Sequence, residues 1–383
     1  MLHVLERLGA GGTEWQAAHV AAALSRRGIA SHITALEASD APAALRELLR
    51  EAGVGLSCLA IPHRWSLARG AARVARLARD FGADILHARL YFPGLHVAAS
   101  RALLPRPRRV WSYHNVIYEY PDRTAWDEAR RLLEVLAARG FDAFAAVSAG
   151  ARESYARHVG SHPIHVVPNG VLLDELRGRP AERARVAEIH RLDPAGLWAV
   201  VPARFVFEKA HDVLVAAATR LPPAVPVRFL CAGRGPLLEA SRAAATRAGV
   251  EDRFVFLGEL ERPSLLDLIQ VSDLVVLPSL FEGFPNAAAE AMALGRPLIS
   301  SDIAALRDLV VPEVSGLLVP AGDPDALAAA ISRATRDSAL RHRLGDAGRV
   351  RIEAKFGIES VAEEWLTLYR RLLTDPRAAR AAT

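Results

Sequence analysis

Short apolar runs alternate with longer helical patterns along almost the whole chain. In the first half, runs such as LHVLERL, ADILHAR and RRVWSYHN have the length and composition of buried strands, and alanine-rich segments such as EWQAAHVAAALSRRG lie between them. Strands that alternate with helices pair in parallel, because each helix carries the chain back to the same end of the sheet. The alternation therefore predicts an α/β fold built on doubly wound parallel sheets.

The regular pattern is interrupted once. After Asn169 and Gly170 it loosens through RGRPAERARVAEIHRLDPAG, and a second series of strands starts at LWAVVPAR. A chain of 383 residues is also longer than one hydrophobic core usually supports. We predict an N-terminal Rossmann-like domain over 1–180, a second over 181–360, and a C-terminal helix within 361–383 that packs back on the first domain and ends in a frayed tail. Two such domains that face each other leave a cleft lined by the loops of both.

Composition narrows the class of protein. Hydrophobic residues make up 51% and charged residues 24% of the chain, which is typical of a globular protein. The chain has a net charge of +5, and almost all of its positive charges are arginines. Compositional drift also produces an excess of arginine, so this charge is not evidence for nucleic acid binding, and we expect no nucleic acid partner. Cys58 and Cys231 lie far apart and form neither a disulfide framework nor a zinc pattern. Because neither a signal peptide nor a membrane span is visible, we expect a cytoplasmic protein with a peripheral contact at the inner face of the membrane.

The segment FEGFPNAAAEAMALGRPLIS places two glutamates around a helix start. Pro285 and Asn286 favour the start of a helix, and Gly295 favours its end. The apolar run DLVVLPS before it predicts a buried strand, so Glu282 lies in a loop at the carboxyl end of a parallel strand, where ligands bind. A helix N-terminus favours phosphate, and Glu290 inside the helix suits hydroxyl groups. On this segment alone, an ordinary helix with a solvated glutamate is an equal alternative.

Two further loops have the composition of phosphate sites. In GAGGTEW, Gly11 and Gly12 follow the first strand and precede a helix, although a plain tight turn explains them equally well. In PARFVFEKAHDVL, Arg204 ends a strand and Lys209 precedes a helix. Two cations at that position can clamp a diphosphate, and we favour this role over that of solvated loop charges.

Aromatic loops in the first half are candidates for an acceptor pocket. His114 ends the strand RRVWSYHN and can bind a sugar or an acceptor, whereas Tyr113 and Tyr118 are equally well explained by packing. We expect the loops around Trp65, at 89–92 and at 113–120 to shape this pocket.

Together, these stretches resemble the retaining glycosyltransferases of family 4, also called glycosyl transferases group 1, which have the GT-B fold. The likeness runs from LGAGGTE through VSAGARE, VVPNGV and PARFVFEKAHDVL to LPSLFEGFPNAAAEAMALGRPLISSD and GLLVPAGDPDAL, nearly the whole chain. The Glu-x7-Glu segment is its specific part. The chain departs from the family where Ala210, Ala304 and Ala305 replace usual glycines and Asp308 replaces a glutamate. These changes narrow the space near the donor.

The resemblance implies a role for each charged residue. Arg204 and Lys209 match the cation pair on the donor diphosphate. Glu290 matches the carboxylate on the ribose hydroxyls, and Glu282 matches the carboxylate near the donor sugar, which we expect to orient the sugar rather than attack it. His114 matches a first-domain histidine close to the transferred sugar.

The resemblance also implies the rest of the substrate pocket and its chemistry. Further binding residues are Gly11, Gly12, Gly283, Phe284, Pro285 and Asn286. The family needs no divalent metal and no cofactor, since the nucleotide sugar, UDP- or GDP-linked, is a substrate. The DPD segment at Asp323 resembles a metal motif, but an aspartate at a helix start is better explained as an N-cap.

The implied reaction moves a sugar from a nucleotide diphosphate sugar to an acceptor hydroxyl, with retention at the anomeric carbon. The acceptor is expected to be a glycan or a lipid-linked molecule, as in the synthesis of cell-surface glycan, polysaccharide or glycolipid. Two alternatives stay open, namely a nucleotide-sugar epimerase of the same fold and a homologue that binds the donor without catalysis.

Overall fold

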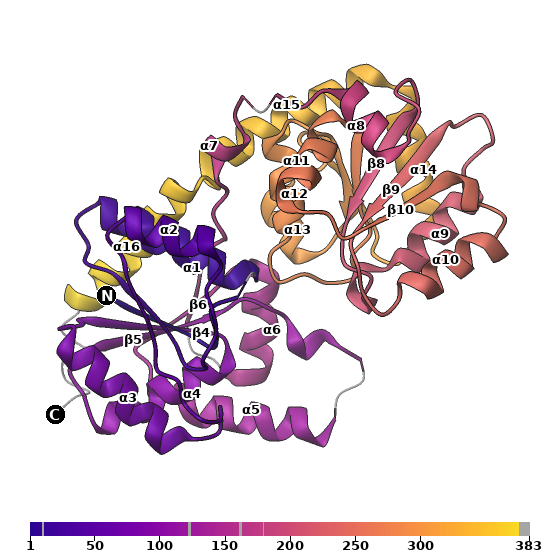
Figure 1. The fold of residues 1–383 in the computed structure, drawn as a ribbon. Helices are drawn as coiled ribbons and strands as arrows, with labels where there is room; N and C mark the ends of the chain where they lie inside the picture. The colour runs from indigo at the N-terminus through magenta and orange to yellow at the C-terminus, as the bar shows by residue number, and fades with distance from the viewer. Residues whose placement is uncertain (10, 122–123, 161–162, 179, 375–383) are drawn as a thin grey trace. The chain divides into compact units, whose positions relative to one another are not determined.

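The computed structural model describes residues 1–9, 11–121, 124–160, 163–178 and 180–374. They form two compact units, drawn in Figure 1. Unit 1 contains Met1–Gly170 and the chain from Ile358, and unit 2 contains Val171–Gly357. The tail predicted to fray, from residue 375, lies outside the described residues.

The limits of the units differ from the predicted limits at 180 and 360. The chain leaves unit 1 at Gly170 and re-enters it at Ile358. Just inside unit 2, the Val171 amide donates to the Phe356 carbonyl at 2.7 Å, so the outgoing and returning segments lie side by side. The loosely patterned segment after Gly170 therefore belongs to unit 2, where it forms two short helices.

Unit 1 contains a parallel sheet in the order β3-β2-β1-β4-β5-β6-β7. Its strands are β1 Leu2–Leu5, β2 His32–Ala35, β3 Gly55–Cys58, β4 Ile85–Arg89, β5 Arg108–Tyr113, β6 Ala143–Ala146 and β7 Ile164–Val166. The strand order reverses between β1 and β4, and a doubly wound sheet leaves a crevice for ligands beyond the carboxyl ends of the strands at such a switch point.

Helices cover both faces of this sheet. They are α1 Gly12–Arg26, α2 Ala43–Glu51, α3 Leu67–Asp80, α4 Tyr91–Ala99, α5 Ala125–Ala138, α6 Ala149–Val159 and α16 Ile358–Thr374, with 3-10 turns η1 Ser100–Ala102 and η2 Ile117–Glu119. Figure 1 shows α1, α2 and α16 on one face and α3, α4 and α5 on the other. The segment at 89–92, predicted as a loop, is instead the end of β4 and the first turn of α4.

The last helix of the chain completes unit 1. Val361, Trp365 and Tyr369 are spaced four residues apart in α16 and are all buried, as expected for the apolar stripe of an amphipathic helix. The helix packs against α1, and Arg26 forms an ion pair with Glu359 at 2.7 Å.

Unit 2 repeats the architecture with a parallel sheet in the order β10-β9-β8-β11-β12-β13. Its strands are β8 Leu197–Pro202, β9 Val227–Ala232, β10 Phe254–Gly258, β11 Leu274–Leu277, β12 Leu298–Ser301 and β13 Leu317–Val319. The order reverses between β8 and β11, which is the switch point of this sheet. Ala199 and Val201 on β8 and Phe229 and Cys231 on β9 alternate along their strands into one buried cluster.

The helices of unit 2 connect these strands. They are α7 Leu173–Leu176, α8 Arg183–His190, α9 His211–Arg220, α10 Leu238–Arg247, α11 Arg262–Val271, α12 Asn286–Ala293, α13 Ala304–Leu309, α14 Pro324–Arg336 and α15 Ser338–Lys355, with 3-10 turns η3 Phe207–Lys209 and η4 Glu251–Arg253. Across the described parts of both units, the helices are too short or too polar to traverse a lipid bilayer.

Candidate active site

The switch point of unit 2 brings together a lysine and a glutamate from two loops. Lys209 closes η3 after β8, and Glu282 lies in the loop after β11. The Lys209 Nζ donates to Glu282 Oε1, and Ser279 Oγ donates to the same oxygen at 2.8 Å. The Lys209 side chain is 18% exposed and that of Glu282 only 9%, so this pair lies mostly out of water. The two residues that the sequence assigns to diphosphate and sugar are therefore in direct contact.

Arg204 behaves differently from Lys209. Its side chain is 71% exposed, and its Nη2 is 3.4 Å from Glu208 Oε1. The Glu208 carbonyl accepts from the Leu280 amide at 2.8 Å, which ties the loop after β8 to the loop after β11. Arg204 is thus a weakly held cation on a fixed backbone, and a ligand can recruit it without breaking a buried contact.

The backbone around Arg204 is fixed by glycines that the sequence analysis did not assign to the site. A Cβ at Gly233 would lie 2.1 Å from the Ala203 carbonyl oxygen, and one at Gly235 would lie 2.3 Å from the Phe205 carbonyl oxygen. The loop after β9 can therefore approach the loop after β8 only with glycine at both positions. Both glycines lie in the segment CAGRGP, and their spacing two residues apart was the feature of the sequence that could have indicated their role.

Ala210, which follows Lys209, has a left-handed backbone with φ 47° and ψ 51°. This conformation explains why glycine is usual at this position, because a Cβ is disfavoured there. The next residue, His211, begins α9 as predicted and stacks on Phe205 with ring centroids 4.0 Å apart. Burial, followed by the charge of Lys209, lowers the pKa of His211 to about 4.

Glu290 in α12 has a side chain that is 15% exposed, and it is bound by a residue that the sequence analysis missed. Arg262, at the start of α11, donates to Glu290 Oε1 and also to Glu175 Oε2 at 3.0 Å. Burial raises the pKa of Glu290, whereas the charge of Arg262 lowers it. In the free protein, Arg262 therefore donates to the same carboxylate that the sequence assigns to the ribose hydroxyls.

Helix α12 begins and ends at the predicted residues. It starts at Asn286 after Pro285, and the Asn286 amide already donates to the Phe284 carbonyl at 3.0 Å. Phe284 is 7% exposed, and its ring centroid is 6.4 Å from that of Phe356, so its side chain belongs to the core. The helix ends at Ala293, and Gly295 follows at the predicted C′ position in a left-handed conformation with φ 70°.

The site residues predicted in the first half lie around the switch point of unit 1. Gly11 is the N-cap of α1 with extended backbone, φ −71° and ψ 155°, and Gly12 is the first residue of the helix. Without a side chain, Gly11 makes no capping hydrogen bond to the first turn. His114 follows β5, and its Nε2 is 2.9 Å from Ser112 Oγ. Burial, and then the charge of Arg89, hold the pKa of His114 well below its usual range, so its ring is neutral.

Arg89, at the end of β4, begins the segment 89–92 that the sequence analysis expected to shape the acceptor pocket, although no role was assigned to this residue itself. It is 1% exposed, and its Nη1 lies 3.4 Å from His114 Nε2. It lines a cavity of about 320 Å³ together with residues after β1 and in the first turn of α1, including Thr13. The sequence shows an arginine at the carboxyl end of an apolar strand, but it does not show that this arginine lacks a partner.

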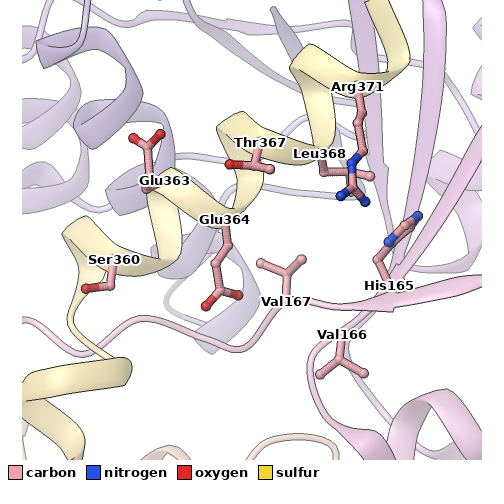
Figure 2. Close-up of a pocket in the computed structure, with 9 residues that line it drawn as sticks. All are labelled: His165, Val166, Val167, Ser360, Glu363, Glu364, Thr367, Leu368 and Arg371. Carbon is pink, nitrogen blue, oxygen red and sulfur yellow. The ribbon is translucent and has the colours of Figure 1, made fainter. Parts of the chain in front are cut away.

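A different cavity, of about 530 Å³, lies between β7 and α16. Figure 2 shows the Glu364 and Arg371 side chains of α16 directed toward β7 and Glu363 directed away. None of its lining residues is a predicted site residue. Among the described residues there is also no cluster of three metal-binding side chains, and Asp323 caps α14 by accepting from the Asp325 and Ala326 amides at 3.0 Å each.

Two doubly wound units with polar loops at both switch points define the class of protein. The model of the family described as Glycosyltransferase Family 4 matches residues 10–175, and that of Glycosyl transferases group 1 matches residues 198–337. The chain belongs to this family of glycosyltransferases.

Individual relatives share part of the chain. The D-inositol 3-phosphate glycosyltransferase of Xylanimonas cellulosilytica is 35% identical over 226 residues, which are 57% of this chain and 53% of that protein. The 2-deoxystreptamine glucosyltransferase of Streptomyces kanamyceticus is 31% identical over 216 residues, 56% of each chain. The chain thus spans about half the length of the curated relatives it matches.

Solved structures share the fold over nearly the whole length. A glycosyltransferase from Rickettsia africae has a TM-score of 0.81 at 17% identity, with 98% of both chains covered. The Anabaena protein Alr3699/HepE, solved in complex with UDP and glucose, has a TM-score of 0.81 at 19% identity, with 97% of this chain and 99% of that chain covered. At these identities the likeness concerns the fold.

Proposed function

We propose that this glycosyltransferase moves a sugar from a nucleotide diphosphate sugar to an acceptor hydroxyl, retains the anomeric configuration and needs no metal ion. The observation that carries the proposal is the contact between Lys209 and Glu282 at the switch point of unit 2. This contact supports the proposal because Lys209, the cation for the leaving diphosphate, lies next to Glu282, the carboxylate for the sugar. The complexes of Alr3699/HepE with UDP and UDP-glucose support a nucleotide-sugar donor.

The proposed donor site works by exchange of partners. In the free protein, Lys209 is neutralised by Glu282, and Arg204 is held only loosely by Glu208. A bound diphosphate takes both cations, which leaves the Glu282 carboxylate available to a hydroxyl of the donor sugar. At the other end of the nucleotide, the ribose hydroxyls replace the guanidinium of Arg262 on Glu290.

The chemistry follows from this arrangement. As the bond between the anomeric carbon and the phosphate oxygen breaks, negative charge grows on the diphosphate, and Arg204 and Lys209 stabilise it. The acceptor oxygen attacks on the face that the phosphate leaves, and its proton passes to the departing phosphate oxygen. The sugar therefore keeps its configuration. His114, neutral at physiological pH, hydrogen-bonds a hydroxyl of the transferred sugar.

A donor-binding experiment tests the proposal. The purified protein is heated with UDP, GDP, ADP or dTDP, each in magnesium and in EDTA, and its melting temperature is recorded. We expect stabilisation by one nucleotide, equal in both buffers, abolished in Glu290→Ala and retained in Glu188→Ala, which removes an exposed glutamate from α8 of the same unit. Stabilisation that depends on magnesium would contradict the metal-free site, and no stabilisation by any nucleotide would contradict the donor site.

Product analysis then tests the reaction. Incubation of the donor sugar with the protein alone separates a transferase from an epimerase, because an epimerase converts its substrate without an acceptor. With an acceptor present, NMR of the product gives the anomeric configuration. An inverted product would overturn the retaining mechanism.

A further inference from the structure

Arg89 is a buried cation at the position where a doubly wound sheet binds ligands. It is the last residue of β4, beside β1 at the switch point of unit 1, and only 1% of its surface is exposed. With the neighbouring Leu90 it lines the cavity of about 320 Å³ that also contains the first turn of α1. That turn begins at Gly12 without a side-chain cap. An uncapped helix start and a buried arginine thus border the same small cavity.

The guanidinium of Arg89 lacks the partners that a buried cation requires. Its Nε and Nη2 have no hydrogen-bond partner, and its contact with His114 is long, at 3.4 Å. Its Cζ lies 5.6 Å from the centroid of the Trp365 ring. Within the described part of the chain, no carboxylate forms an ion pair with Arg89. The described residues therefore leave this guanidinium without a paired counter-charge.

The histidines around Arg89 leave this charge uncompensated. His3 and His87 are both buried, and burial together with the charge of Arg89 holds the pKa of each well below its usual range. They are therefore neutral near pH 7, as His114 is. The histidines next to Arg89 consequently do not offset its positive charge, an arrangement that persists at a cost unless a ligand brings the anion.

A second buried arginine shows what a structural role looks like in the same sheet. Arg109, at the other end of the neighbouring strand β5, is also fully buried. Its Nε donates to the Val97 carbonyl at 3.2 Å and its Nη1 to the Pro107 carbonyl at 2.8 Å, and its Nη2 donates to the Leu104 carbonyl. Arg109 is satisfied on every nitrogen, so the lack of partners at Arg89 is not a general property of arginines buried in this sheet.

We propose that Arg89 binds a phosphate or carboxylate group on the acceptor, so that the substrate accepting the sugar is an anionic polyol. The inference rests on the proposed transferase function. Nε and Nη2 form one edge of the guanidinium, the edge that binds two oxygens of an oxyanion in parallel. Both nitrogens are buried without a hydrogen-bond partner, so they are the donors that this oxyanion uses.

The carboxylates in the cavity fit the rest of such a molecule. Glu6 and Glu14 also line it, and Arg64 pairs with Glu6 at 3.2 Å. Carboxylates accept hydrogen bonds from hydroxyl groups, so they suit the polyol part. The donor diphosphate has its own cations, Arg204 and Lys209, in the other unit, and the Arg89 site is therefore assigned to the acceptor.

Anion binding is tested with inorganic phosphate and acetate as probes on protein saturated with the nucleotide that stabilises it in the melting experiment. Isothermal titration of the wild type is expected to show saturable binding of at least one of the two anions, and Arg89→Met is expected to weaken it by about tenfold or more. Arg139→Met is the control, because Arg139 is an exposed arginine of unit 1 that does not line this cavity. Its effect on anion binding is expected to stay below about twofold.

Stability provides a second readout that a merely structural arginine would not give. In buffer without phosphate or carboxylate, Arg89→Met is expected to melt at or above the temperature of the wild type, because it removes an uncompensated buried charge. Arg109→Met is expected to melt lower. Equal anion binding in wild type and Arg89→Met, or a marked loss of stability in Arg89→Met, would overturn the proposal.

The failure of this inference can be told apart from failure of the proposed function. If the wild type binds none of the four nucleotides, the proposed function fails and the acceptor inference fails with it. If Arg89→Met binds the stabilising nucleotide as the wild type does but has lost anion binding, both stand. If Arg89→Met instead raises the KM for hydrolysis of the sugar conjugate of that nucleotide, Arg89 binds the donor and the acceptor inference is overturned.

Two further arms identify the source of the anion. Glycerol 3-phosphate is compared with glycerol, and vesicles of phosphatidylglycerol are compared with vesicles of phosphatidylcholine. Binding of glycerol 3-phosphate that depends on Arg89 indicates a soluble acceptor, and binding of phosphatidylglycerol vesicles that depends on Arg89 indicates a lipid headgroup. Binding of both probes without dependence on Arg89 would overturn the proposal.

Discussion

The two switch points of this molecule handle positive charge in opposite ways. In unit 2, the mostly buried Lys209 is paired with Glu282, and the exposed Arg204 lies beside Glu208. In unit 1, the buried Arg89 has neutral histidines for neighbours and no carboxylate among the described residues in an ion pair with it. The same fold therefore contains one site whose charges are balanced from within and another whose charge is not.

This difference changes what a ligand does on binding. We expect a ligand at the balanced site to replace an internal partner, so that the binding energy is reduced by the contact that is lost. At the unbalanced site, we expect the ligand to form an ion pair without displacing an internal partner. Such an exchange would favour release of the ligand after reaction, whereas a new ion pair would favour selection of anionic molecules.

The largest effect is expected at the balanced site. Lys209→Ala should lower kcat for sugar transfer by about 100-fold to 1000-fold, since it removes a contact that strengthens as charge develops on the diphosphate. The control is Lys355→Ala, because Lys355 is the only other lysine in the chain and lies exposed at the end of α15. If the kcat of Lys209→Ala is within about threefold of the wild-type value, Lys209 does not take part in the reaction.

The next effect separates the two buried arginines. Arg109→Met is expected to lower the free energy of unfolding by roughly 2 to 3 kcal/mol, because three carbonyl groups lose their charged donor. Urea denaturation in phosphate-free buffer measures it. Arg89→Met should show no such loss, and a similar loss in both variants would end the distinction between them.

A smaller effect concerns pH. His3, His87 and His114 have a lower pKa in the folded than in the unfolded protein, so the unfolded state binds protons first as the pH falls below about 6.5. Stability should therefore be complete above that pH and decrease below it, by about 1.4 kcal/mol per pH unit for each histidine once it is protonated in the unfolded state.

Urea denaturation between pH 5 and pH 7.5 measures this slope. His3→Leu should remove the contribution of one proton, and a slope unchanged by that substitution would show that His3 carries a proton in the folded state. His63→Leu, at an exposed histidine, is the control.

The smallest effect concerns the backbone beside Lys209. Ala210→Gly should raise the free energy of unfolding by about 0.5 to 1 kcal/mol, because the left-handed conformation at this position costs alanine more than it costs glycine. Ala216→Gly inside α9 should lower it by about 1 kcal/mol. If both substitutions destabilise the protein equally, the conformation of Ala210 carries no strain.

The sequence predicted most strands because their apolar runs are uninterrupted, and it missed elements whose residues contradict the local rules. β3, Gly55–Cys58, is a partly exposed edge strand with polar residues. α4 contains Pro93 and Gly94, which local rules treat as helix breakers. A Cβ at Gly94 would lie 2.1 Å from the Trp111 ring, so packing against β5 requires this glycine in spite of its low helix propensity.

The candidate site was predictable in its residues but not in their pairing. Glu282 and Glu290 could be assigned to loop and helix from neighbouring prolines and glycines, and the structure places them there. That Arg262 binds Glu290 depends on how α11 packs against α12, which local patterns do not contain. That Arg89 lacks hydrogen-bond partners was even harder to predict from the sequence, because it depends on every residue that lies near Arg89 in space.

The order in which the chain is made bears on the Arg89 site. Unit 2 is one continuous segment, whereas unit 1 needs α16, which leaves the ribosome only after the whole of unit 2. Tyr369 hydrogen-bonds His87 at 2.8 Å, and Trp365 lies over Arg89, so both side chains that cover the cation arrive last. During synthesis the second unit can fold first, while the N-terminal sheet waits with this face uncovered. A chain that stops before residue 358 would therefore keep a complete unit 2 and leave unit 1 open to chaperones and proteases.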